Sequence, residues 1–192
     1  MHRILVIGPC GAGKSFVSER LGEALNLPVI HLDAEYFLPG WVEPDPVSWE
    51  RRLADLISRP SWVIDGSHLA TLAQRLRRAN SVVLLDIPTW VCFLRVIGRV
   101  ATQYGRVRPD MAAGCPEQLD VAFLKFVLQY RRDQLPRVLA QLKRFEGSVL
   151  RLRTTPEVNR FLASPSAWLS ATQDALHESN SNSTVVERAF DP

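Results

Sequence analysis

Long apolar runs, lysines and paired cysteines are scarce in this chain of 192 residues. No stretch approaches the roughly 18 uncharged apolar residues typical of a membrane span, and Met1-His2-Arg3 leads directly into a short apolar run without a signal-peptide pattern. We therefore expect a cytoplasmic protein with no membrane partner. The three cysteines are far apart and contain no C-x-x-C pair, which argues against a disulfide framework or a structural zinc site: Cys10, Cys92 and Cys115.

The charge of the chain favours anionic ligands. The net charge is +3, and nearly all of the 23 basic residues are arginine, whose planar guanidinium binds phosphate through two parallel hydrogen bonds. Residues 171–192 are acidic on balance, so the rest of the chain is more positive than the whole. We see no clustered basic recognition helix and no nucleic-acid-binding motif, which argues against direct binding of nucleic acid.

One motif near the N-terminus is highly informative. Residues 8–15 read G-x-x-x-x-G-K-S, and they lie between the apolar run 4–7 and a segment with helical spacing. Backbone N–H groups of such a loop, with the positive end of the helix dipole, wrap the phosphates of ATP. Lys14 would reach the β- and γ-phosphates, and Ser15 would ligate Mg²⁺. The predicted nucleotide-binding residues are Gly8, Pro9, Cys10, Gly11, Ala12, Gly13, Lys14, Ser15 and Phe16.

Short apolar runs alternate with helical patterns along the chain, which is typical of a parallel α/β sheet with helices on both faces. Five strands are predicted, at Arg3–Ile7, Val29–Leu32, Trp62–Asp65, Val82–Asp86 and Val149–Leu152. Helices are predicted over 46–58, 69–79, from Pro88 to about 104, over 120–145 and over 156–163. The fold class is therefore α/β, a P-loop NTPase fold with a five-stranded parallel sheet.

The predicted domain organisation is simple. Residues 1–170 form one P-loop kinase-like domain, with an acceptor-site segment at about 33–60. Glycine and proline punctuate residues 104–119, a composition suited to a mobile lid. Residues 171–192 are low in apolar content, and we expect them to be disordered.

Three carboxylates follow predicted strands, at the edge where ligands bind in such sheets. Phosphoryl transfer needs one carboxylate to hold Mg²⁺ and often another to orient the acceptor. We assign Asp65 to the metal and Asp33 to the acceptor, although the sequence leaves the exchange of these two roles open. Asp86 precedes a helix, where a capping role is the simpler interpretation. His31 and His68 are more readily structural than catalytic.

Arginines are placed where they can surround a transferring phosphoryl group. Arg95 and Arg99 lie four apart on one predicted helix, where an anion between them would relieve their repulsion. Two more lie in the lid, and at most one of the adjacent pair at 131 and 132 can face the site. The predicted catalytic set is Lys14, Asp33, Arg95, Arg99, Arg106, Arg108 and Arg131, whereas a solvated face is the simpler interpretation for Arg75, Arg77 and Arg78.

Taken together, these features resemble the adenylate-kinase-like group of P-loop kinases. Within that group, His31-Leu32-Asp33, the strand end 62–66 and especially residues 108–117 (RPDMAAGCPE) resemble the FlaR-related DNA topology modulation proteins. The resemblance spans residues 1 to about 163, and the lid sequence is its specific part. It implies a five-stranded core with a lid, and ATP with Mg²⁺ as the donor pair.

The acceptor side departs from true adenylate kinases. There the Asp-Gly strand end continues into Phe-Pro-Arg, whose arginine helps hold the monophosphate, whereas this chain continues into Ser67-His68-Leu69. A short acceptor segment with an acid after the second strand is closer to shikimate and gluconate kinases, which phosphorylate a hydroxyl group. Tyr36 and Trp41 are candidates to line this pocket, although core packing is the simpler use of a lone Trp.

The sequence thus favours a kinase that transfers the γ-phosphoryl group of ATP to a small-molecule or nucleotide acceptor. Two alternatives remain open. One is a nucleotide-binding regulatory protein of the topology modulation type, with little or no kinase activity. The other is a plain NTPase, which would need a water-activating residue and a lid that admits water.

Overall fold

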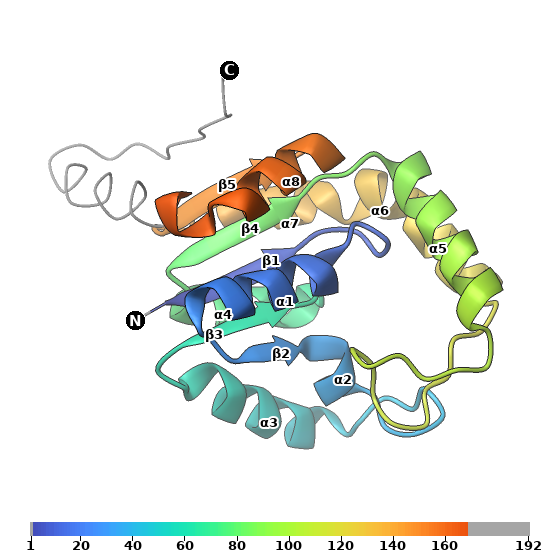
Figure 1. Cartoon of the computed structure of the whole chain (residues 1–192). Coiled ribbons are helices and arrows are strands. Elements are labelled where there is room, and N and C mark those ends of the chain that lie inside the picture. Colours follow the sequence, from blue (N-terminus) through green and yellow to red (C-terminus); the bar gives the residue numbers. More distant parts are fainter. Residues whose placement is uncertain (1, 169–192) are drawn as a thin grey trace, which may run out of the picture.

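A five-stranded parallel sheet forms the centre of the protein in this computed structural model, which describes residues 2–168 (Figure 1). The strand order is β2-β3-β1-β4-β5, and each neighbouring pair is parallel. The predicted α/β class is confirmed, while the predicted disorder of residues 171–192 lies outside the described residues. The strands are β1 (Arg3–Ile7), β2 (Val29–His31), β3 (Trp62–Asp65), β4 (Ser81–Leu85) and β5 (Ser148–Leu152).

Helices cover both faces of this sheet (Figure 1). Successive strand residues point to opposite faces, so Ile4 and Val6 join one apolar cluster while Leu5 and Ile7 join the other. The first cluster packs against α1 (Lys14–Leu25), α5 (Thr89–Gln103) and α8 (Thr155–Ala163). The second packs against α3 (Pro46–Ser58), α4 (Leu69–Arg78) and α7 (Leu135–Leu142), while α6 (Val121–Asp133) contributes one residue to each.

Local signals explain several helix boundaries. Helix α3 has the predicted bounds, with Pro46 at its start and the Asp45 carboxylate accepting a hydrogen bond from the Ser48 amide at 2.9 Å. The single helix predicted over 120–145 is wrong, because the chain breaks at Gln134 into α6 and α7. Pro136 explains the break, since proline lacks an N–H and its ring clashes with the preceding helical turn.

Two short features near the sheet edge were not predicted. A single helical turn, α2 (Leu32–Tyr36), follows β2 directly and carries Asp33. The lid segment 104–119 contains a small apolar cluster of its own, in which Met111, Ala112 and Cys115 pack against Phe37 and Trp41. No helix within residues 2–168 is long and apolar enough to cross a membrane.

Candidate active site at the strand ends

The P-loop lies between the end of β1 and the start of α1, as its mechanism requires. Gly11 is in the left-handed conformation (φ 84°), and a Cβ there would lie 2.4 Å from the Cys92 carbonyl oxygen, so only glycine allows this approach to α5. Gly13 (φ 94°) is the N-cap of α1, and open space lies beside it. The loop is therefore packed against α5 at Gly11 and open at Gly13.

The open side of the loop presents positive charge. The first backbone bond of α1 runs from the Val17 N–H to the Gly13 carbonyl, and no side chain caps the helix, so the amides before Val17 face the open side. The Lys14 ammonium donates to the Pro9 carbonyl at 3.2 Å. Burial lowers its pKa, but Cys10, Asp33 and Asp65 outweigh that effect, so the pKa is raised and Lys14 is charged.

The end of β3 carries Asp65, and Ser67 just after it binds the P-loop backbone. His31 and Asp65 are paired in the parallel register, and His31 Nδ1 lies 2.7 Å from Asp65 Oδ2. This hydrogen bond is the main reason that the pKa of His31 is raised. Ser67 accepts a hydrogen bond from the Gly8 amide at 2.9 Å and donates one to the Gly8 carbonyl. Ser67 is a residue that sequence reasoning missed, since no local pattern relates it to a loop 59 positions away.

The expectation that Arg75 lies on a solvated face is wrong, because this side chain is completely buried. Its guanidinium donates to the carbonyls of Gly66 at 2.8 Å and His68 at 2.6 Å, beneath the loop that joins β3 to α4. Burial lowers its pKa to about 10, which leaves it charged at neutral pH. Arg77 and Arg78 are exposed, as expected.

Asp33 lies on α2, directly after β2 at the carboxyl edge of the sheet, and its carboxylate has no hydrogen-bond partner among residues 2–168. Its charge raises the pKa values of Lys14, His68 and Arg75, although burial is the largest influence on the pKa at each of these groups. Burial and Arg75 lower the pKa of His68, so this imidazole is neutral at neutral pH. Tyr36 lies against it, with ring centroids 4.6 Å apart.

Asp86 takes part in ion pairs rather than capping. Helix α5 starts after Pro88 without a side-chain cap, and the buried Asp86 carboxylate pairs with Arg151 at 2.7 Å and Arg131 at 3.2 Å. Of the adjacent arginines on α6, Arg131 therefore faces the sheet edge, while Arg132 is exposed and pairs with Asp133.

The two arginines of α5 have separate partners in this structure. Arg95 donates to the Ala12 carbonyl of the P-loop at 3.4 Å and to the Thr155 hydroxyl at 2.9 Å. Arg99 pairs with the buried carboxylate of Glu117, its Nε lying 3.0 Å from Oε2. Arg95 is thus beside the phosphate-binding loop, and Arg99 is connected to the lid.

The lid reaches the P-loop through Asp110. The Ser15 hydroxyl donates to Asp110 Oδ2 at 2.6 Å, and Arg108 Nη1 pairs with the same oxygen at 3.0 Å. Burial raises the pKa of Asp110, but the Ser15 hydroxyl and Arg108 outweigh it, so the pKa is lowered and Asp110 is ionised. The Arg106 side chain is exposed and has no ion pair within the described part of the chain.

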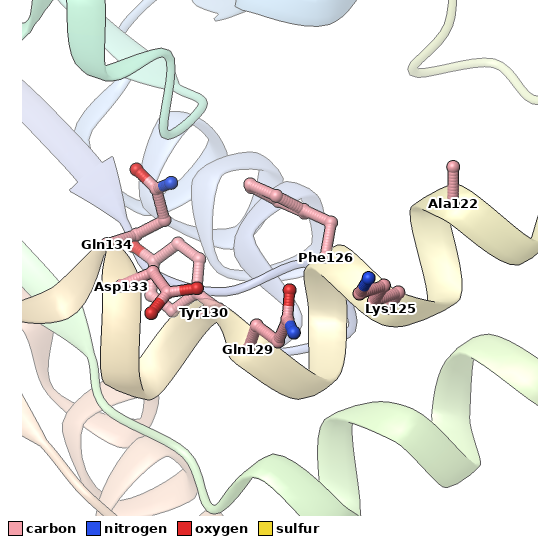
Figure 2. A pocket seen from close by; sticks show the side chains of 7 residues that line it. All are labelled: Ala122, Lys125, Phe126, Gln129, Tyr130, Asp133 and Gln134. Carbon is pink, nitrogen blue, oxygen red and sulfur yellow. The ribbon is translucent and has the colours of Figure 1, made fainter.

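A groove of about 360 Å³ follows one side of α6. Figure 2 shows that its lining side chains all come from this helix and its C-terminal end: Ala122, Lys125, Phe126, Gln129, Tyr130, Asp133 and Gln134. Burial raises the pKa of the Tyr130 phenol, while the Ser67 hydroxyl and Lys14 act in the opposite direction.

The residues around the P-loop fit a nucleoside triphosphate with Mg²⁺. The open front of Gly13, the uncapped amides of α1 and charged Lys14 suit phosphates. Ser15 and Asp65 offer the hard oxygen ligands that Mg²⁺ prefers. Among residues 2–168 no group of three His, Cys, Asp or Glu side chains forms a metal site, and Mg²⁺ on phosphates needs only one or two protein ligands besides water.

Solved structures with the same fold include several kinases. Shikimate kinase from Acinetobacter baumannii in complex with shikimate has a TM-score of 0.55 at 22% identity, covering 88% of this chain and 93% of that one. Shikimate kinase from Aquifex aeolicus has a TM-score of 0.51 at 19% identity, and the match covers 91% of this chain and 98% of that one. Shikimate kinase from Bacteroides thetaiotaomicron has a TM-score of 0.51 at 16% identity, and the match covers 88% of this chain and 98% of that one. No protein-family model and no curated protein sequence matches. These likenesses, with the parallel sheet, establish the α/β P-loop NTPase fold.

Replacing Arg75 tests whether its buried guanidinium holds the β3–α4 loop. In Arg75→Met the Gly66 and His68 carbonyls lose their donors, so the free energy of unfolding should fall by about 2 kcal/mol or more. Urea unfolding measures this change. The exposed Arg77→Met variant is the matched control and should change stability by no more than about 0.5 kcal/mol. Equal stabilities of the two variants would contradict the assigned role of Arg75.

Proposed function

We propose that this protein is a P-loop kinase that transfers the γ-phosphoryl group of ATP to a hydroxyl group of a small molecule. The observation that carries the proposal is the position of Asp33, which follows β2 at the same sheet edge as Lys14 and whose carboxylate has no hydrogen-bond or ion-pair partner among residues 2–168. An acid beside the phosphate-binding lysine is where an acceptor hydroxyl would meet the γ-phosphoryl group.

The donor half of the reaction follows from the P-loop. Lys14 and the amides at the start of α1 would bind the β- and γ-phosphates, and Ser15 would ligate Mg²⁺. Asp65, whose Oδ2 is held by His31, would supply the carboxylate near the cation. A cation held by these residues would supply positive charge that offsets the charge of the phosphates. Arg95 from α5, which donates to the Ala12 carbonyl of the P-loop, would stabilise the charge that develops on the transferring group, and Arg108 of the lid would assist once it is released from its carboxylate partners.

The acceptor half is assigned to the side of α2, where the Tyr36 ring lies against His68. Asp33 would orient the acceptor hydroxyl and accept its proton, while Tyr36 would offer an apolar wall. Arg99, Arg106, Arg108 and Arg131 have weaker support as phosphoryl-stabilising groups, because Arg99, Arg108 and Arg131 pair with carboxylates and Arg106 is exposed. We also propose that this protein belongs to the topology modulation group, on the resemblance of its lid sequence at residues 108–117.

An acceptor panel with labelled ATP tests the proposed function. We expect transfer of label to at least one hydroxyl compound, with Lys14→Ala as the control that abolishes transfer by removing phosphate contacts. Label released only as inorganic phosphate would favour an NTPase instead. Nucleotide binding without transfer to any acceptor would favour the regulatory alternative.

Asp33→Asn tests the role of the free acid. Because Asp33 would act on the acceptor rather than on the donor, kcat should fall about 10²–10⁴-fold while ATP affinity changes little. Steady-state kinetics and calorimetry measure the two quantities. Asp55→Asn, an exposed acid on α3, is the matched control and should leave both unchanged. A large loss of Mg²⁺-dependent ATP binding in Asp33→Asn would instead exchange the roles of Asp33 and Asp65.

A further inference from the structure

A continuous series of charged groups connects helix α5 to the P-loop through the lid. It runs from Arg99 to Glu117, on to Arg108, then to Asp110 and the Ser15 hydroxyl, and its ion-pair distances are 3.0 Å. The series ends on Ser15, the side chain that would ligate Mg²⁺ under the proposed function. Asp110 is thus the one lid carboxylate that contacts the donor site within the described residues.

Glu117 fixes the base of the lid. Its carboxylate is only 5% exposed and pairs with Arg99 and Arg108, both at 3.0 Å. Its backbone accepts from the Gly105 amide and donates to the Arg106 carbonyl, both at 2.8 Å, which closes the two ends of the segment on each other. Arg108 is therefore held independently of Asp110, and Asp110 is held by Arg108.

The tip of the lid is docked on the segment after α2. The Gly40 amide donates to the Gly114 carbonyl at 2.8 Å, and Trp41 Nε1 donates to the Pro116 carbonyl at 3.0 Å. Trp41 adopts φ 63°, a left-handed conformation that is unfavourable for a bulky residue and persists where its surroundings determine it. The lid thus bridges the donor side and the acceptor side.

The hydrogen bond to Asp110 sets the orientation of the Ser15 hydroxyl. Because the proton points to Asp110 Oδ2, the lone pairs of Ser15 Oγ are free for a cation on the other side. Arg108 neutralises the carboxylate in the absence of a cation. A carboxylate that orients a metal ligand from behind raises the affinity for the metal, and removal of such a group typically costs about 10- to 100-fold.

We propose that Asp110 is a positioning residue for the cation of Mg·ATP, acting through the Ser15 hydroxyl, so that the cation site is complete only when the lid is closed. This inference rests on the proposed function. Because the same lid is docked on residues 37–42, closure would assemble the cation site and the acceptor side together. A kinase built in this way would bind Mg·ATP weakly while its acceptor side is open.

Calorimetry of ATP binding with excess Mg²⁺ and with EDTA tests this inference. The quantity of interest is the gain in affinity that Mg²⁺ provides. We expect Asp110→Ala to lower that gain about 10- to 100-fold while leaving affinity in EDTA nearly unchanged. Asp110→Asn keeps an oxygen that can accept from Ser15, so its loss should be smaller. Val107→Ala, an exposed position of the same lid, is the matched control and should behave as the parent protein.

Three results would overturn the inference. Tighter binding in both conditions would identify Asp110 as a competitor of the nucleotide rather than a positioning residue. Equal losses with Mg²⁺ and EDTA would assign it a merely structural role in the lid, and unchanged binding would assign it none. Failure of the parent protein to bind ATP in either condition would instead contradict the proposed function, so the two failures are distinguishable.

Discussion

The register of the parallel sheet is the constraint on which the candidate site depends. It pairs Val6 of β1 and His31 of β2 with Asp65 of β3, so the three strands end at one edge. The P-loop leaves β1 at this edge, Asp33 follows β2, and the Asp65–Ser67 turn follows β3. A shift in register would separate Ser67 from Gly8 and His31 from Asp65, and the phosphate-binding loop would lose its support.

Charge compensation is the second principle of this site. Two buried acids near the edge are matched by arginines: Asp86 by Arg151 and Arg131, and Glu117 by Arg99 and Arg108. Asp33 differs, because it influences Lys14 and Arg75 without a direct hydrogen bond to either among the described residues. An acid left available beside a charged lysine is poorly explained by stability alone, which is why it carries the proposed function.

The fold was predictable from the sequence because its signals are local. The motif at 8–15, the apolar runs and the Asp45-Pro46 helix start each lie within a few residues, and the structure has the corresponding elements. One exception is the 120–145 region, where apolar spacing continued past Pro136 and hid the break, and another is the single turn α2. The carboxylates at strand ends were also predictable, since strand ends of a parallel sheet meet at one edge.

The missed contacts join distant parts of the chain. Ser15 and Asp110 are 95 positions apart, and no periodicity or motif relates them. Arg75 resembled its exposed neighbours in sequence, and only the packing of α4 beneath the β3–α4 loop distinguishes it. Sequence patterns therefore locate the loop between β1 and α1 and the strand-end acids, whereas the orientation of each side chain depends on tertiary contacts.

The most direct test of this account is a crystal structure of the protein with Mg²⁺ and a non-hydrolysable ATP analogue. The account predicts the β- and γ-phosphates on the amides at the start of α1 and on the Lys14 ammonium, with the cation on Ser15 and the γ-phosphate facing Asp33. An analogue bound elsewhere, or a γ-phosphate turned away from Asp33 toward bulk solvent, would contradict the proposed phosphoryl transfer to an acceptor at this edge of the sheet.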